Sequence, residues 1–178
     1  GRGLVAVRDI EPGVLLCVDQ PLVTAESFGE LVGSVAARAN DDEVFRRQVL
    51  CFCRDPSVEP AGGARADVPP SAELVHSIVQ HNYHGVDAPP VDGELRRGAP
   101  AMVGLWPLSS LTNHSLRPNV ARSFAGRCCC HCSIRRLRAG DEVLDNYLDL
   151  RLPAAMRRAM LWRNYKISDE GPDDCDGP

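Results

Sequence analysis

The chain of 178 residues carries 20 Lys and Arg against 24 Asp and Glu, which gives a formal net charge of −4. This length fits one domain that can bury a core without disulfide staples. The negative balance argues against nonspecific nucleic-acid binding, and no apolar run approaches the ~20 residues of a membrane span. We therefore expect neither nucleic acid nor a membrane as a direct partner.

The first predicted element is a β-hairpin in residues 1–23. Alternating apolar residues precede Pro12-Gly13, and the apolar run 14–18 follows it. Because Pro-Gly marks a turn between two such runs, we expect the runs to pair with each other. Gly1 and Gly3 lack a Cβ, so their backbone can approach a ligand closely. An ordinary strand start is the commoner meaning of a Gly-x-Gly taken alone.

Helices are predicted in residues 28–52 and again after Ser71. Asp41 can cap the first helix, whose apolar face comprises Val44, Phe45, Val49 and Phe52. Ser71 can cap the second helix, whose apolar face comprises Leu74, Val75, Ile78 and Val79. Residues 55–70 lie between the helices, are rich in Pro, Gly and Ala, and are expected to form a loop.

A segment rich in polar and helix-breaking residues follows a short predicted strand at residues 101–105. It contains Trp106, Pro107, Asn113, His114, Pro118 and Asn119. Neither a helix nor a strand accommodates this combination well, so we interpret the segment as a shaped loop. Its Asn and His side chains are expected to hold the backbone in place or to meet a ligand.

Residues 121–134 are predicted to be β structure that contains a cysteine cluster. The cluster reads Cys128-Cys129-Cys130-His131-Cys132. Adjacent residues of a strand face opposite sides, so these thiols do not readily converge on one tetrahedral ion. We interpret them as small strand residues, with a redox or metal role as the alternative. Clustered cysteines in a chain of this length favour reduced thiols, and hence the cytoplasm, the nucleus or both.

The last predicted helix covers residues 154–162 and begins after Pro153, a residue suited to a first helical turn. Its expected inner residues are Met156, Ala159, Met160 and Trp162. Residues 168–178 are acidic and rich in Gly and Pro, which predicts a disordered tail.

The loop segment carries a family resemblance. Asn113-His114-Ser115-Leu116-Arg117-Pro118-Asn119 resembles the SET-domain signature Asn-His-Ser-Cys-x-Pro-Asn, with Leu116 in place of Cys. Other motifs of that family occur in the expected order: Gly1-Arg2-Gly3-Leu4 and the turn at residues 10–13 come before it, and a strand-turn-strand pattern at 134–147 follows. The stretch from Tyr147-Leu148-Asp149 through Arg157-Arg158 and Leu161 to Tyr165 is similar to the SET-and-MYND (SMYD-like) and tetratricopeptide–SET subgroup.

This resemblance implies a β-rich α+β SET-domain fold over residues 1–167, with a helical and loop insertion at 24–100 and a C-terminal helix. It implies methyl transfer from S-adenosylmethionine to a lysine side chain of a protein substrate, histone or non-histone. The implied catalytic residues are Tyr147 and Tyr165, and the implied cofactor contacts are Gly1, Arg2, Gly3, Asn82, Ser110, Asn113 and His114. Purely structural roles are the alternatives: a helix-ending Asn82, a buried strand aromatic at Tyr147 and a helix-end anchor at Tyr165.

Several departures from the family are visible. Cys51 and Cys53 have no matching Cys/His set nearby, so no MYND finger is expected. The positions of the zinc ligands in relatives hold Leu116, Asp169, Gly171 and Asp174, with Cys175 out of register. We therefore expect no zinc. Ile167 also replaces a family aromatic. The alternatives are a catalytically inactive SET-fold interaction module and a cysteine-cluster metal-binding protein. Because the motifs begin at Gly1, we expect further domains to flank this piece in a longer chain.

Overall fold

The computed structural model describes residues 3–86, 101–148, 152–165 and 167–168. Its helices are α1 (Phe28–Asp41), α2 (Glu43–Leu50), α3 (Ala72–Asn82) and α4 (Ala154–Tyr165), with 3-10 turns η1 (Pro56–Val58) and η2 (Ser109–Leu111). Its strands are β1 (Leu15–Asp19), β2 (Val23–Ala25), β3 (Tyr83–Val86), β4 (Met102–Leu105), β5 (Asn113–His114), β6 (Val120–Ala125), β7 (Cys128–Ser133) and β8 (Leu144–Asp145). Short sheets combined with helices confirm the expected α+β class.

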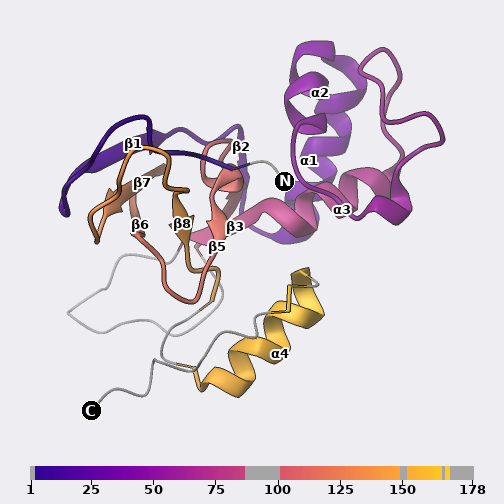
Figure 1. The fold of residues 1–178 in the computed structure, drawn as a ribbon. Coiled ribbons are helices and arrows are strands. Elements are labelled where there is room, and N and C mark those ends of the chain that lie inside the picture. The colour runs from indigo at the N-terminus through magenta and orange to yellow at the C-terminus, as the bar shows by residue number, and fades with distance from the viewer. Residues whose placement is uncertain (1–2, 87–100, 149–151, 166, 169–178) are drawn as a thin grey trace. The chain divides into compact units, whose positions relative to one another are not determined.

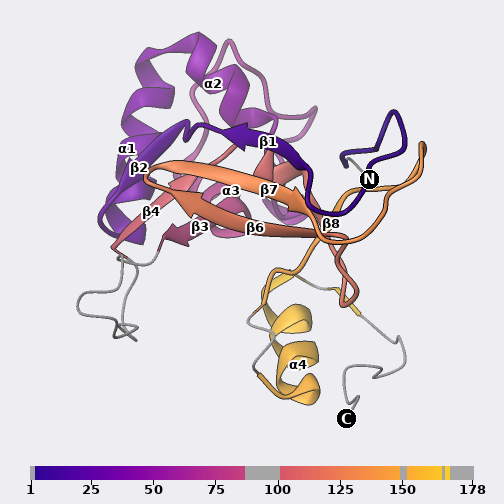
Figure 2. The same cartoon turned by 90° about the vertical axis from the view of Figure 1, so that its left-hand side faces the viewer.

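The strands form three small sheets and the chain forms two compact units. The sheet orders are β1-β7-β6, β2-β4-β3 and β5-β8, and Figure 2 shows β1, β7 and β6 side by side. One unit, here the terminal unit, comprises Gly1–Val18, Leu111–Ser123 and Cys130–Pro178. The other, here the helical unit, comprises Asp19–Ser110 and Phe124–Cys129. Among the described helices, none has an apolar stretch of the length needed to cross a bilayer.

The helical unit is built on a continuous apolar core. In this unit α1, α2 and α3 pack together, with the β2-β4-β3 sheet beside them (Figure 1). The buried core residues are Leu31, Val35, Ala39, Phe45, Val49, Phe52, Leu74, Val75, Ile78, Val79, Val103 and Leu105. The predicted cap and apolar face of the second helix are confirmed, because Ser71 Oγ accepts from Leu74 N at 3.2 Å and all four predicted face residues are buried.

The predicted single helix at 28–52 is instead two helices that separate at Asp42. Asp42 has an extended backbone (φ −115°, ψ 104°) and its carboxylate accepts from Phe45 N at 2.9 Å, so it caps α2. The predicted cap, Asp41, is the last residue of α1. Val44 is 69% exposed and does not belong to the apolar face, whereas Phe45 is fully buried. The cap of α2 thus lies one residue after the predicted one, and the buried face of the helix includes Phe45 but not Val44.

Two buried polar side chains fix the irregular parts of the helical unit. The guanidinium of Arg46 donates to the carbonyls of Ala39 and Asn40 at the end of α1 and to that of Ala66 in the following loop. The fully buried Trp106 donates from its indole Nε1 to the carbonyl of Arg127 at 2.9 Å. Each bond satisfies a carbonyl that has no partner in a helix or sheet ladder.

The close pairing of β2 with β4 explains the glycine within β4. Gly104 lies opposite Thr24 in the register of these antiparallel strands. A Cβ added to Gly104 would lie 2.7 Å from the carbonyl oxygen of Val23, a backbone atom that cannot move aside. Glycine at this position therefore permits the approach of the two strands.

The terminal unit pairs segments that are far apart in sequence. Isolated bridges join Val5 to Glu142 and Ile10 to Leu137. Gly13 has a φ of 86° and donates its N–H to the carbonyl of Ser133 at 2.7 Å. The predicted turn is present, but the predicted hairpin is wrong, because the segments on either side of Gly13 pair with these distant partners. The small core of this unit comprises Ala6, Val120, Leu137 and Val143.

Helix α4 buries a different stripe from the one predicted. Met156 and Trp162 are 52% and 58% exposed, while Arg157 and Leu161 are 4% and 0% exposed. The buried pair has the i, i+4 spacing of one helix face, and the next residue on that face is Tyr165. Apolar residues occur on both faces of α4, so periodicity alone assigned the wrong one.

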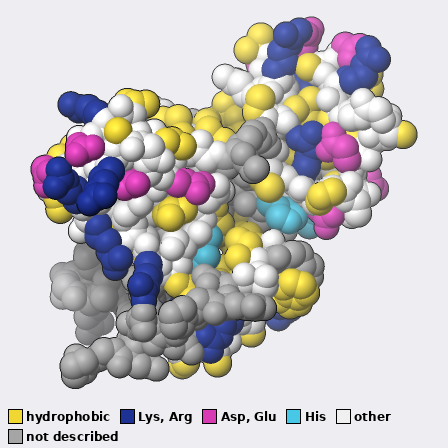
Figure 3. Space-filling model, in the orientation of Figure 1, with side chains coloured by type: hydrophobic (Ala, Val, Ile, Leu, Met, Phe, Trp, Pro, Cys, Tyr) yellow, Lys and Arg dark blue, Asp and Glu magenta, His cyan; other side chains and the backbone are white. Residues whose placement is uncertain are grey.

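Charged side chains of both signs lie close together on the surface of the helical unit (Figure 3). Arg47 pairs with Glu43 one helical turn away, and Arg65 pairs with Asp67 in the loop before α3. Such exposed pairs contribute little to stability and keep the surface polar.

Candidate active site

The centre of the candidate site is the parallel pairing of β5 with β8. Asn113 lies opposite Leu144 and His114 opposite Asp145. Ser115 N donates to the Asp145 carbonyl at 2.9 Å, which extends the pairing by one residue. This contact brings the Asn-His loop alongside the strand that ends at the predicted catalytic tyrosine, as the resemblance implies for these two segments.

Asn119 holds the two segments together with its side chain. Its Oδ1 accepts from Leu144 N at 2.8 Å, and its Nδ2 donates to the Glu142 carbonyl at 2.8 Å. Its backbone N–H donates to the Leu144 carbonyl at 3.0 Å. The amide thus bonds the backbone as a neighbouring strand would, at a place where a regular ladder is absent.

Tyr147 is oriented by the loop that it reaches. Its hydroxyl donates to the Thr112 carbonyl at 2.7 Å, and its backbone N–H donates to His114 Nδ1 at 3.1 Å. Since Nδ1 accepts this bond, a neutral His114 ring carries its proton on Nε2. The rings of His114 and Tyr147 are 5.1 Å apart at their centroids.

Tyr165 completes an aromatic group around Tyr147. The centroids of the two tyrosine rings are 5.2 Å apart, with an angle of 59° between the planes. Tyr165 is the last residue of α4 and shares the helix face of the buried Arg157 and Leu161. The two predicted catalytic tyrosines are therefore neighbours, and His114 adjoins the same group.

Gly3 lies against polar groups of the same unit. A Cβ added there would lie 2.5 Å from Glu142 Oε1 and 2.9 Å from Asn113 Nδ2. The Asn113 amide donates to that carboxylate oxygen at 2.6 Å. Gly3, Asn113 and Glu142 therefore meet at one point. The other predicted glycine-strand contacts, Gly1 and Arg2, lie outside the described residues.

Asn82 and Ser110, the two remaining predicted cofactor contacts, belong to the helical unit. Asn82 is 4% exposed, and its Nδ2 donates to the carbonyls of Cys53 and Ile78, both at 2.6 Å. Ser110 Oγ donates to the carbonyl of Trp106 at 2.9 Å and to that of Asn82 at 3.3 Å. These bonds give Asn82 a structural role at the end of α3, and its contact with a cofactor stays a prediction.

The residues of the terminal unit suit one end of S-adenosylmethionine. Gly3 and the β5 loop offer backbone groups, Asn113 offers an amide, and Glu142 offers a carboxylate to a cationic group. Tyr147 offers a hydroxyl oxygen that can accept a hydrogen bond. This set of groups fits a zwitterionic ligand that also carries a positive sulfonium.

The cysteines form no metal site within the residues that the structure describes. No three His, Cys, Asp or Glu side chains there converge as metal ligands. On β7, Cys129 is buried and Cys128, Cys130 and Cys132 are half-buried, in alternation along the strand. Three of the residues at positions that correspond to zinc ligands in the family, Asp169, Gly171 and Asp174, lie outside the described residues, as does Cys175.

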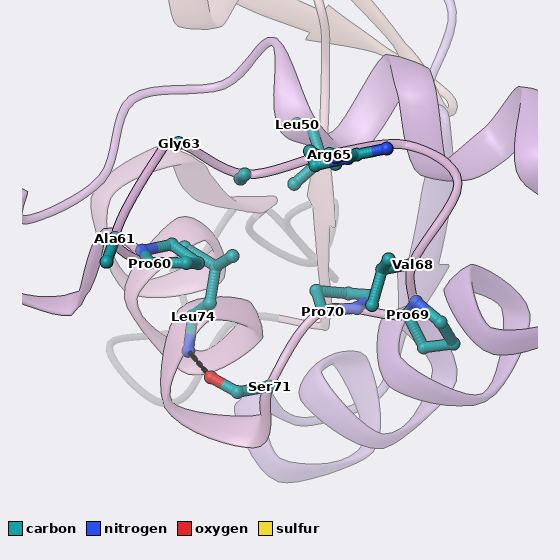
Figure 4. Close-up of a pocket in the computed structure, with 11 residues that line it drawn as sticks. Leu50, Pro60, Ala61, Gly63, Arg65, Val68, Pro69, Pro70, Ser71 and Leu74 are labelled. Carbon is teal, nitrogen blue, oxygen red and sulfur yellow. Dashed lines mark hydrogen bonds between the residues drawn. The ribbon is translucent and has the colours of Figure 1, made fainter.

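A hollow outside the candidate site lies between the loop 60–70 and the start of α3 (Figure 4). Its lining is mainly apolar: Leu50, Pro60, Ala61, Gly63, Ala64, Val68, Pro69, Pro70 and Leu74, with Arg65 and Ser71. Its volume is about 190 Å³, below the roughly 300 Å³ at which ligand pockets begin. Arg65 is already paired with Asp67. We assign this hollow no role in the chemistry.

Comparison with known proteins decides the family. Residues 1–148 match the SET domain. The chain belongs to the SET-domain family. This match covers the glycine strand, the Asn-His loop and Tyr147, and it ends before Tyr165.

Individual relatives are SMYD proteins. The chain is 30% identical over 98 residues to a SET and MYND domain-containing protein of Dictyostelium discoideum, covering 54% of this chain and 29% of that protein. It is 38% identical over 63 residues to the histone-lysine N-methyltransferase SMYD3 of Mus musculus, covering 35% and 15%. It is 33% identical over 95 residues to the N-lysine methyltransferase SMYD2-A of Xenopus laevis, covering 53% and 21%. This SMYD-like SET chain thus spans less than a third of each of these relatives.

Three contributors to the site were missed from the sequence of this SET domain. Thr112 acts through its backbone carbonyl, which leaves no signal in residue type. Asn119 belongs to the motif, but its residue type does not indicate that its side chain bonds to the backbone of Glu142 and Leu144. Glu142 lay in the strand-turn-strand motif, five residues before Tyr147, and its acidic side chain was the available signal.

Proposed function

We propose that this SET domain is an S-adenosylmethionine-dependent protein-lysine N-methyltransferase. The observation that carries the proposal is the setting of Tyr147. Its hydroxyl is fixed on the Thr112 carbonyl, and its ring contacts those of His114 and Tyr165. The three lysine methyltransferase names among the relatives, of which two are given above, support the same class.

The reaction requires a neutral amine in line with a methyl group, and alignment is what a protein can supply. When bound, S-adenosylmethionine supplies the methyl group and a sulfonium leaving group. The hydroxyl of Tyr147 donates its proton to the Thr112 carbonyl, so its oxygen can accept from the lysine amine and orient it. The aromatic rings around Tyr147 disfavour the charged ammonium by excluding water, which lowers the pKa of a lysine placed among them.

Methyl transfer with a matched variant tests this function. Purified protein is incubated with radiolabelled S-adenosylmethionine and mixed protein substrates, and label in lysine is measured. Tyr147→Phe keeps the ring and removes the hydroxyl, so we expect the rate to fall about a hundredfold, with a stability change near 1 kcal/mol.

Tyr83→Phe is the control, because Tyr83 lies in β3 and contacts the Phe28 ring. It should leave the rate unchanged. Wild-type protein that transfers no methyl group would contradict the function. An unchanged rate in Tyr147→Phe would contradict only the role of this tyrosine.

The second candidate function is an inactive SET-fold interaction module. Leu116 in the motif and Ile167 after Tyr165, at positions where the resemblance implies a cysteine and an aromatic, favour it. Saturable S-adenosylmethionine binding together with lysine methylation would exclude this module. For the active enzyme we propose a protein substrate, a cytoplasmic or nuclear location and flanking domains in a longer chain.

A further inference from the structure

The carboxylate of Glu142 lies where three segments of the terminal unit meet. Its Oε1 accepts from Asn113 Nδ2 at 2.6 Å and is within 2.5 Å of the position that a Cβ on Gly3 would occupy. Glu142 forms an isolated bridge with Val5, so its backbone is fixed beside the segment that contains Gly3. The side chain is exposed on the surface of this unit and accessible to a ligand.

The carboxylate determines which way the Asn113 amide faces. An ionised carboxylate only accepts hydrogen bonds, so the amide must present its NH₂ group to Glu142. Its Oδ1 is attached to the same carbon and therefore points away from the carboxylate. An amide oxygen is a hydrogen-bond acceptor, so this orientation presents an acceptor on the side away from Glu142.

The order of groups along the site indicates which part of the cofactor meets Glu142. Tyr147 contacts His114, whereas Glu142 contacts Asn113, the preceding residue of β5. The sulfonium must lie near Tyr147 for the methyl group to reach the amine. Two methylene groups separate that sulfur from the carbon that bears the α-ammonium group, so the amino-acid end can extend from His114 toward Asn113.

We infer that Glu142 is a cofactor-positioning residue that binds the α-ammonium group of S-adenosylmethionine, through its own charge and by orienting the Asn113 amide. This inference rests on the proposed function and adds a residue to it. A carboxylate beside an ammonium forms a charge-assisted hydrogen bond, which is stronger than a neutral one. Glu142 thereby selects ligands that carry the amino-acid end.

Binding measurements with two related compounds test the inference without any turnover. Isothermal titration calorimetry uses S-adenosylhomocysteine and 5′-deoxy-5′-methylthioadenosine, which keeps the adenosyl thioether but lacks the amino-acid end. Glu142→Gln should weaken S-adenosylhomocysteine binding about tenfold to a hundredfold, the range for a hydrogen bond to a charged group. Its affinity for the methylthio compound should stay the same.

Two further variants make the result specific. Glu11→Gln removes an exposed carboxylate of the same unit that pairs with Arg136, and should change neither affinity. Glu142→Asp keeps the charge but withdraws the carboxylate from Asn113, and should weaken S-adenosylhomocysteine alone by a smaller factor. This variant also carries the test if Glu142→Gln fails to fold.

The possible outcomes separate the inference from the function beneath it. Equal weakening of both compounds, or no weakening of S-adenosylhomocysteine in either Glu142 variant, would overturn the role of Glu142 while leaving the methyltransferase proposal in place. Wild-type protein that binds neither compound would overturn both. Selective weakening of S-adenosylhomocysteine supports the inference.

Discussion

The helical and terminal units differ in the size of their apolar cores. Among the described residues, the helical unit has a core of twelve buried apolar side chains, whereas the core of the terminal unit has four. In the terminal unit, the Asn119 side chain bonds directly to the backbone of a segment that is distant in sequence. Apolar burial is nondirectional and tolerates many sequences, but a side chain that hydrogen-bonds to the backbone must be of one type and in one geometry. The candidate site lies in the unit with the smaller apolar core.

The largest expected effect comes from removing an aromatic ring from the helical core. Phe45 is fully buried, and Phe45→Ala should lower the free energy of unfolding by about 3–5 kcal/mol through lost burial and a cavity. Denaturant titration followed by far-ultraviolet circular dichroism measures this change. Val44→Ala alters the adjacent, exposed residue and should stay within about 0.5 kcal/mol. Equal losses in the two variants would contradict the assigned face of α2.

A smaller stability effect is expected from removing the Asn119 side chain, which joins two segments of the terminal unit. Asn119→Ala leaves the N–H of Leu144 and the carbonyl of Glu142 without their side-chain partner. The expected cost is about 1–3 kcal/mol. Hydrogen exchange should show faster opening of the segment around β8, with protection in α1 and α3 unchanged.

Asn40→Ala is the control for this variant, because Asn40 is an exposed residue of α1. In the Asn40→Ala variant, the backbone amide hydrogens of both units should exchange as in the wild type. Uniform loss of protection across the Asn119→Ala chain would show that the two units do not differ in the way described here.

The smallest effect concerns a pH-dependent ion pair in the loop of the helical unit. Hydrogen bonds from Arg54 and then from Ala64 N–H lower the pKa of Glu59 from 4.5 to about 2. A lowered folded-state pKa stabilises the protein above pH 4.5, and this contribution is lost as the pH falls toward about 2. Thermal unfolding across this window measures the dependence.

Glu59→Gln should flatten that part of the pH profile without altering the profile near neutral pH. Glu43→Gln, which removes an exposed i, i+4 pair with Arg47 on α2, is the matched control. A profile that retains its full slope in Glu59→Gln would show that other groups cause it.

Sequence reasoning succeeded where one local rule determines the outcome. Ser71 caps α3 because a serine followed by a helical apolar pattern leaves few alternatives. The cysteines lie in a strand, β7, as predicted, and their burial alternates along it. For Tyr147, His114 and Asn113, ordered motifs supplied a proximity that no local pattern contains.

Predictions failed where several local solutions compete. Pro12-Gly13 correctly indicated a turn, but pairing of the residues around it with Leu137 and Ser133 depends on long-range topology. In α4, exposed Trp162 and buried Arg157 reverse the usual order of polarity, and Tyr165 lies on the same helix face as Arg157. The contact of Glu142 with Asn113 and its position beside Gly3 likewise depend on pairing between distant segments.

The contrasting positions of the two tryptophans give the protein built-in optical reporters. The chain contains two Trp residues: Trp106 is fully buried in the helical unit, and Trp162 is 58% exposed on α4 of the terminal unit. An indole shielded from water fluoresces at shorter wavelength and resists quenching by dissolved iodide, whereas an exposed one emits at longer wavelength and is quenched. Iodide therefore silences Trp162 selectively, and the remaining emission follows the integrity of the helical unit alone.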